Sequence, residues 1–288
     1  MSFTRFLQPI SRSWRRAPLT DAMHRGKVSV AHSVICYYKY RQLTSHQHDG
    51  SMCNMLEQEE SLSLAAGITR GDTLTDQAES VLRDALMSGG FRPGETITIR
   101  SLSGRLGVSV TPAKDAMARL IGERILEWGP RRSALVPALT LQSIEEIYAI
   151  RLALEPIAAA AAMRNIPGKS IAELKKINAR LATAMEKKNY KSVLVSNRDF
   201  HFAIYGRAGL PMLLKMIEGM WLRLGPSLNL LYTGHPKLPF SKRGGTGFHT
   251  EIVAAIEERD EAALRQHIAD DLATGRDRLK TIFTLQQP

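Results

Sequence analysis

Cysteine is nearly absent from this chain. Among 288 residues only Cys36 and Cys53 are cysteines, and both lie near one end of the sequence. Two cysteines in these positions cannot form a disulfide framework for a chain of this length, so we expect a reducing, cytoplasmic compartment. Zinc sites built on cysteine are also excluded for residues 54–288.

Long apolar runs are missing as well. The most apolar helix-like stretch, Ala149–Met163, contains Arg151 and Glu155, and nothing approaches the run of about 18 uncharged apolar residues that a membrane span needs. We therefore expect no membrane partner. The chain also lacks the H-E-x-x-H pattern of zinc peptidases and the G-x-S-x-G pattern of serine hydrolases.

Positive charge is in excess but is spread unevenly. The chain has 39 Lys and Arg against 28 Asp and Glu, for a formal net charge of +11, which suggests an anionic partner such as nucleic acid. Residues 1–54 hold eight basic and two acidic residues, so more than half of the excess lies there. The hydrophobic fraction of 44% is ordinary for a globular protein.

The first 72 residues are expected to be a leader outside the folded body. Residues 1–54 show no helical or strand periodicity, which predicts disorder. Three explanations for them remain open: a basic arm that touches DNA, an organelle-targeting peptide, or translation that really starts at Met52 or Met55.

Residues 73–139 are predicted to form a winged helix-turn-helix. Thr75 is expected to cap a helix over 76–88, Thr98 a second helix that ends at Gly107, and Thr111 a third over about 112–123 with Pro112 as its first residue. Two short helices joined by a tight turn are typical of a DNA-reading motif.

The segment from Ile125 to Val136 is strand-like and is interrupted by Trp128-Gly-Pro-Arg-Arg132, which predicts a hairpin wing with a basic tip. The alternative is a small helical domain that never meets DNA.

The stretch RSLSGRLGVSVTPAKDAMARLIGERIL, preceded by FRPGETI, resembles the N-terminal winged helix of GntR-type bacterial transcription regulators. The resemblance implies that Arg100, Ser109, Thr111 and Lys114 hold DNA-contact positions. It also makes Arg131 and Arg132 of the wing candidates for backbone or minor-groove contacts.

This chain departs from the family pattern at two of these positions. Val110 stands where the family usually has Arg, and Lys114 where it usually has a second Arg. Valine offers only apolar contact, and lysine keeps the charge without the planar fork of arginine. We therefore expect an altered operator specificity that relies more on phosphate contacts.

Residues 143–285 read as an all-helical bundle, which makes the fold mainly α. Ser143-Ile-Glu-Glu146 and Ser170-Ile-Ala-Glu173 match the capping box. The predicted helices span 143–164, 170–188, 190–208, 211–232, 247–258 and 260–284, and a loop is expected over 233–247.

Histidines in this bundle suggest a metal site. Asn197 and His201 lie four residues apart on one predicted helix face, as do His267 and Asp271, and His249 opens another helix. Such a set would suit a divalent metal, although a lone histidine is more often a surface or hydrogen-bonded core residue.

The segments SIEEIYAIRLALEPIAAAAAMRN, NRDFHFAIY and FHTEIVAAIEERDEAALRQHIADDL look like the all-helical effector-binding domain of the FadR-type branch of GntR regulators. The resemblance implies four metal ligands: Asn197, His201, His249 and Asp271. Asn197 replaces the usual Asp and Asp271 the usual His, which favours Mn, Mg or Zn. His267 is an alternative to Asp271.

The resemblance also implies effector-binding residues. It places Arg151 where family members often hold an effector carboxylate, and the alternative is a salt bridge to Glu155 four residues on. Arg223 is a second anion-binding candidate, with a solvent-facing arginine as its alternative.

The resulting hypothesis is a ligand-responsive transcription regulator that binds double-stranded operator DNA as a homodimer and a small carboxylate effector in its bundle. It would reside in the bacterial cytoplasm, at the nucleoid when bound to DNA. The rival hypothesis is a metalloenzyme that uses His201 and His249.

Overall fold

The computed structural model describes residues 73–233 and 246–285. The expected leader lies outside these ranges, and so do residues 234–245 of the expected loop. In the two described ranges, no helix combines the length and the apolarity that a membrane crossing requires.

The first described helix, α4 (Leu74–Met87), begins two residues earlier than the sequence suggested. Thr73, not Thr75, is its N-cap: the Thr73 backbone is extended and its hydroxyl accepts from the amide of Asp76 at 3.1 Å. Both threonines are suitable caps, and the choice of Thr73 adds Leu74 and Thr75 to the first turn. The helix ends before Gly89, whose φ is 67°.

A tight turn and a short strand follow. The amide of Glu95 donates to the Arg92 carbonyl at 3.0 Å, and Gly94 has a φ of 78°, as expected for a type II turn around Pro-Gly. Strand β1 (Thr96–Ile97) leads into α5 (Ile99–Leu106). Thr98 caps α5 as predicted, accepting from the Ser101 amide at 3.1 Å, and Gly107 ends it in the left-handed conformation.

The helix expected from Pro112 is α6 (Val110–Gly122), and its N-cap is Ser109 rather than Thr111. Pro112 therefore sits at the third helical position. The backbone amides of the first helical turn have no acceptor within the helix, so a proline at this position removes no internal hydrogen bond. The consequence is that Thr111 lies within the first turn of α6, beside the exposed Val110.

The wing forms as predicted. Strands β2 (Glu127–Trp128) and β3 (Ala134–Leu135) pair antiparallel, and β1 adds to the other side of β3, for the order β1-β3-β2. Trp128 pairs with Ala134 and Thr96 with Leu135. The tip is a 3₁₀ turn (Pro130–Arg132) in which Arg131 and Arg132 have φ values of 54° and 60°.

The rest of the described chain is helical. The elements are α7 (Leu141–Met163), α8 (Gly168–Glu186), α9 (Tyr190–Tyr205), α10 (Pro211–Leu228), α11 (Leu230–Thr233), α12 (Thr246–Glu258) and α13 (Glu261–Leu285). No strand lies within residues 141–233 or 246–285. Gly209-Leu210-Pro211 separates α9 from α10, as predicted.

Both predicted capping boxes are misplaced. Thr140 caps α7 and accepts from the Ser143 amide at 3.1 Å, because a threonine three residues earlier competes for the same role. Helix α8 begins at Gly168 after Pro167, and Ser170 is buried in its first turn without capping it. Spacing alone does not decide between such neighbouring start positions.

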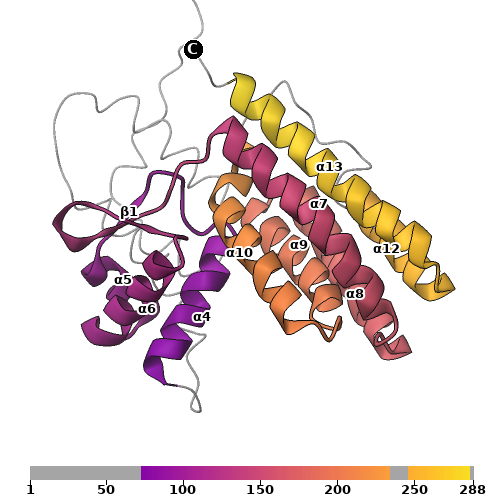
Figure 1. Cartoon of the computed structure of the whole chain (residues 1–288), viewed down its shortest axis with the longest axis horizontal. Coiled ribbons are helices and arrows are strands. Elements are labelled where there is room, and N and C mark those ends of the chain that lie inside the picture. Colours follow the sequence, from indigo (N-terminus) through magenta and orange to yellow (C-terminus); the bar gives the residue numbers. More distant parts are fainter. Residues whose placement is uncertain (1–72, 234–245, 286–288) are drawn as a thin grey trace, which may run out of the picture. The chain divides into compact units, whose positions relative to one another are not determined.

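Helix α7 is central to the bundle. It contacts α9, α10 and α13, and in Figure 1 it lies between α13 and the pair α9 and α10. Helix α10 also packs against α4 of the winged helix. A side chain at Gly225 would overlap the Leu86 carbonyl oxygen and lie 2.8 Å from the Met87 Cα, so glycine permits this close approach.

Candidate functional site

Three predicted metal ligands come together inside the bundle. His201 lies on α9, His249 on α12 and Asp271 on α13, and one ligand atom of each lies within 4.8 Å of the others. The Nε2 atom of His201 is 3.2 Å from Asp271 Oδ2 and 3.4 Å from His249 Nε2. The side chains of His201 and His249 are 1% and 0% exposed.

The protonation of this cluster suits a ligand set. Burial, helped by the nearby His201, lowers the pKa of His249 to about 3, so its ring is neutral at pH 7. Burial opposes the charge of Asp271, but its hydrogen bond with His201 and the nearby Arg151 guanidinium hold the pKa of the carboxyl below its ordinary value. A neutral imidazole and an ionised carboxylate are the forms that bind metals.

Packing fixes the ring of His249. It stacks on Phe200 with a centroid distance of 3.8 Å and an interplanar angle of 8°. Its Nδ1 atom is buried and has no hydrogen-bond partner among the described residues. The Nε2 atom therefore makes the polar contact of this ring, on the side of His201.

Polar contacts also fix the orientation of the His201 ring. Burial holds the pKa of the Tyr205 hydroxyl well above its ordinary value, and this hydroxyl donates its proton to Glu155 Oε2 at 2.8 Å. Tyr205 Oη lies 3.1 Å from His201 Nδ1, so this hydroxyl holds the Nδ1 side of the ring. The Nε2 atom faces Asp271 Oδ2 and His249 Nε2.

The other two residues that the sequence suggested as metal ligands, Asn197 and His267, are not among the three residues of this cluster. Asn197 lies one turn before His201 on α9 and is half-buried, so both side chains leave the helix on the same face. His267 lies 3.4 Å from Glu251 and is not part of the cluster.

Arg151 is engaged by Glu155, as the alternative interpretation proposed. Both side chains are buried, and Arg151 Nε donates to Glu155 Oε1 at 2.5 Å. Trp221 Nε1 donates to the same oxygen at 3.0 Å. The Arg151 guanidinium also lies 4.5 Å from the centre of the Trp221 ring. An internal carboxylate thus occupies the guanidinium that was expected to hold an effector.

Neither Tyr205 nor the contact of Trp221 with Glu155 was predicted from the sequence. Tyr205 follows His201 by one helical turn, a spacing that places both side chains on one face, so a signal existed for it. Trp221 gave no such signal, because it reaches Glu155 only through the packing of α10 on α7.

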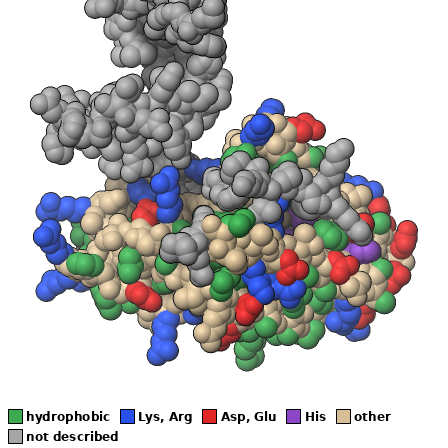
Figure 2. All heavy atoms as spheres, turned by 90° about the horizontal axis from the view of Figure 1, so that it is seen from above, with side chains coloured by type: hydrophobic (Ala, Val, Ile, Leu, Met, Phe, Trp, Pro, Cys, Tyr) green, Lys and Arg blue, Asp and Glu red, His purple; other side chains and the backbone are tan. Residues whose placement is uncertain are grey.

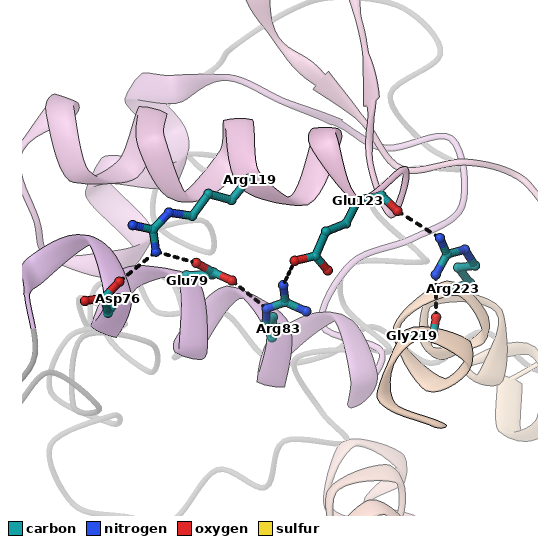
Figure 3. A network of polar contacts seen from close by, with 7 residues as sticks. All are labelled: Asp76, Glu79, Arg83, Arg119, Glu123, Gly219 and Arg223. Carbon is teal, nitrogen blue, oxygen red and sulfur yellow. Dashed lines mark hydrogen bonds and ion pairs between the residues drawn. The ribbon is translucent and has the colours of Figure 1, made fainter. Parts of the chain in front are cut away.

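Arg223 does not belong to the cluster. Its guanidinium donates to the carbonyls of Gly219 and Glu123, both at 2.8 Å, as Figure 3 shows. Glu123 is the C-cap of α6, so Arg223 joins α10 to the winged helix. The expected anion-binding role is replaced here by contacts with two backbone carbonyls.

The six DNA-contact candidates are all exposed in the structure. Arg100 lies on α5, Ser109 and Thr111 at the start of α6, Lys114 one turn later, and Arg131 and Arg132 at the wing tip. Figure 2 shows Lys and Arg side chains projecting at the left edge, on the side where Figure 1 draws the winged helix.

The cations of this domain fall into two groups. Arg83, Arg105 and Arg119 form ion pairs with carboxylates. In residues 73–233 and 246–285, by contrast, no hydrogen bond or ion pair engages the side chains of Arg100, Lys114, Arg131 or Arg132. Arg92 and Arg124 likewise have no side-chain partner among the described residues, so six charges of this domain remain available to an external anion.

Comparisons with known proteins agree with this geometry. The family described as "Bacterial regulatory proteins, gntR family" matches residues 74–136, and the FCD domain matches residues 146–274. The HTH-type transcriptional regulator McbR of Escherichia coli is 33% identical over 198 residues, which cover 69% of this chain and 89% of McbR.

The chain belongs to the GntR family of transcriptional regulators. The solved structure of E. coli McbR/YncC shares 31% identity with a TM-score of 0.68, covering 73% of this chain and 99% of that one. A putative GntR regulator from Rhodococcus sp. RHA1 has the same fold at 19% identity, with a TM-score of 0.57, covering 72% and 98% of the two chains.

Membership of the GntR family confirms the predicted family and the mainly α fold. The matched FCD region contains the His201, His249 and Asp271 cluster, and the matched gntR region contains the exposed cations of the winged helix. The relatives are transcriptional regulators, which favours the regulator hypothesis over the metalloenzyme.

Proposed function

We propose that this GntR regulator binds operator DNA as a homodimer and senses a small carboxylate through a divalent metal in its FCD domain. The observation that carries the sensing part is the meeting of three possible ligand atoms in the bundle. His201 Nε2 lies 3.2 Å from Asp271 Oδ2 and 3.4 Å from His249 Nε2. A divalent cation at this point would be within reach of all three side chains.

The donor set fits Zn²⁺, Mn²⁺ or Mg²⁺. His201 and His249 would supply nitrogen and Asp271 a carboxylate oxygen, with the carbonyl of Asn197 as the fourth ligand. When bound, the metal would act as a Lewis acid for a carboxylate. The protein contributes the orientation: Tyr205 holds the ring of His201 and Phe200 holds the ring plane of His249.

An effector carboxylate would reach Arg151 only by exchanging places with Glu155. Glu155 accepts from Arg151, Tyr205 and Trp221, so it already satisfies the three donors that an effector would need. We therefore propose the metal as the first anchor of the effector. Arg151 would join the contact after Glu155 has moved.

Support for DNA binding comes from the unpaired cations of α5, α6 and the wing. The start of α6 would enter the major groove, with Ser109 and Thr111 at its first turn and Lys114 one turn on. Arg131 and Arg132 at the wing tip would contact the backbone or the minor groove.

Support for a homodimer comes from an apolar face on α7 and α10. Ile157, Met212 and Met216 are 45%, 76% and 54% exposed, and the helices that carry them contact each other. A second copy of the chain would cover these side chains and place two winged helices on one duplex. Met216→Asp is expected to yield monomers in sedimentation experiments, whereas Leu285→Asp, which changes an exposed apolar residue at the end of α13, should leave the dimer intact.

A gel shift tests the proposed function. Fragments from upstream of the gene are titrated with the full chain at moderate salt, with and without added Zn²⁺, Mn²⁺ and small carboxylic acids. We expect a sequence-selective shift whose midpoint moves with one of these additions. The absence of any sequence-selective shift would contradict the regulator proposal.

A further inference from the structure

The recognition helix α6 is fixed at its C-terminal end by charged groups from two directions. Figure 3 shows a continuous chain of contacts across α4, α6 and α10. On the α4 side, Arg119 of α6 reaches Asp76 at 2.6 Å and Glu79 at 2.8 Å. Arg83 of α4 joins Glu79 to Glu123, the C-cap of α6.

On the bundle side, one arginine makes the connection. Arg223 of α10 donates from Nη1 to the Gly219 carbonyl of its own helix and from Nη2 to the Glu123 carbonyl, both at 2.8 Å. A cation at the C-terminus of a helix satisfies a carbonyl that lacks an intrahelical partner and interacts favourably with the helix dipole. Here the cation comes from the effector-binding domain.

Helices α4 and α6 of the winged helix therefore contact the bundle in different ways. Helix α4 is seated by backbone packing at Gly225, by Asn229, which donates to the Gly89 carbonyl at 2.6 Å, and by the Arg198–Asp84 ion pair at 3.1 Å. A cavity of about 400 Å³ opens beside the Arg223–Glu123 contact, lined in part by Ile150, Leu154 and Met216. This contact is thus a polar bridge at the edge of an open space.

Helix α10 also reaches the buried network. Trp221, two residues before Arg223, donates to Glu155, and Glu155 is joined through Tyr205 to His201. One helix therefore contacts the proposed sensing site and the end of the recognition helix.

From this arrangement we infer that Arg223 is a positioning residue that sets the pose of the recognition helix relative to the FCD domain. In a homodimer this pose determines the distance between the two reading helices. Arg223 would thereby determine which half-site spacing the regulator accepts. The inference rests on the proposed function, since it needs a dimer that reads two half-sites.

Operator spacing is a sensitive measure of this role. Moving one half-site by a base pair shifts it by about 3.4 Å and rotates it by about 35° around the duplex. A dimer with fixed reading helices rejects such a duplex, whereas a dimer with loosened helices tolerates it. Misfolding would instead weaken binding to every duplex alike.

The experiment uses the full chain and a duplex that wild type selects from a random-sequence pool. Affinity is measured for this duplex and for versions with one base pair added or removed between the half-sites. Wild type is expected to prefer the selected spacing by about tenfold, the loss typical of one mismatched position. Arg223→Ala should reduce this preference below about threefold while its thermal midpoint stays close to that of wild type.

Two further variants complete the design. Arg223→Gln keeps an amide NH2 donor group but is too short to reach both carbonyls, and it should give an intermediate preference; it decides the matter if Arg223→Ala does not fold. Arg276→Ala removes an arginine that pairs with Asp277 on α13 and should behave as wild type.

The outcomes separate the inference from the function on which it rests. A spacing preference equal to that of wild type in folded Arg223→Ala or Arg223→Gln would overturn the positioning role. Failure of wild type itself to select any duplex would instead contradict the proposed regulator function.

Discussion

The two functional regions of this protein treat charge in opposite ways. On the winged helix, Arg100, Lys114, Arg131 and Arg132 point into solvent without partners in the described chain. Inside the bundle, Arg151 and Glu155 are buried and hold each other, with Tyr205 and Trp221 completing the set. Exposed charges are ready for a large external polyanion, whereas buried paired charges form a fixed framework around a small site.

The largest expected effect concerns the buried pair. Glu155→Gln would leave the Arg151 guanidinium in the interior without a counter-charge, and breaking a buried ion pair in this way typically lowers the free energy of unfolding by about 3–5 kcal/mol. Chemical denaturation measures this change. Glu173→Gln is the matched control, because Glu173 pairs with Arg207 at the surface, and it should change stability by less than about 0.5 kcal/mol.

An equal loss of stability in Glu155→Gln and Glu173→Gln would contradict the expected difference between buried and exposed charges. It would mean that Glu155 contributes no more than a surface carboxylate does.

This contrast also explains how far the sequence alone could predict the molecule. The helix-turn-helix and wing follow from local pattern, because their turns and strands lie within one short segment, whereas the individual DNA-contact residues were implied by the resemblance. Spacing suggested His201, His249 and Asp271 as candidate ligands, but they were joined into one set only through the resemblance, because they are far apart in sequence. No spacing rule joins them without the packing of α9, α12 and α13.

Helix starts were the weakest local prediction. Thr73, Ser109 and Thr140 act as the caps of α4, α6 and α7, each two or three residues before the residue chosen from the sequence. Several residues with short polar side chains compete at each start, and tertiary packing decides among them. The role of Arg223 was missed because the carbonyl it contacts belongs to another domain.

An intermediate effect is expected where the two regions meet. In Gly225→Ala, the added methyl group would overlap the Leu86 carbonyl at the end of α4. Such overpacking typically costs about 1–3 kcal/mol, so the thermal midpoint should fall. Gly104→Ala is the control: nothing lies within 4 Å of a side chain there, and an exposed helical alanine should raise stability by about 0.5–1 kcal/mol.

Stability that is unchanged in Gly225→Ala would show that α4 moves away from α10 without loss. The close packing between the domains would then not constrain the winged helix.

The smallest expected effect concerns an exposed cation of the winged helix. Lys114→Ala should weaken DNA binding and reduce the slope of log affinity against log salt by about 0.9, the value for one phosphate contact on duplex DNA. Fluorescence anisotropy at several salt concentrations measures the slope. Lys169→Ala, which changes an exposed lysine of α8, should leave it unchanged, and an identical slope in Lys114→Ala would exclude a phosphate contact.

Elemental analysis of purified protein tests whether the bundle holds a divalent metal at His201, His249 and Asp271. After equilibration with Zn²⁺ or Mn²⁺ and removal of excess metal, wild type should retain about one metal ion per chain. His201→Ala should retain less than about a tenth of that, and His267→Ala as much as wild type. Equal metal content in wild type and His201→Ala would contradict the proposed metal site.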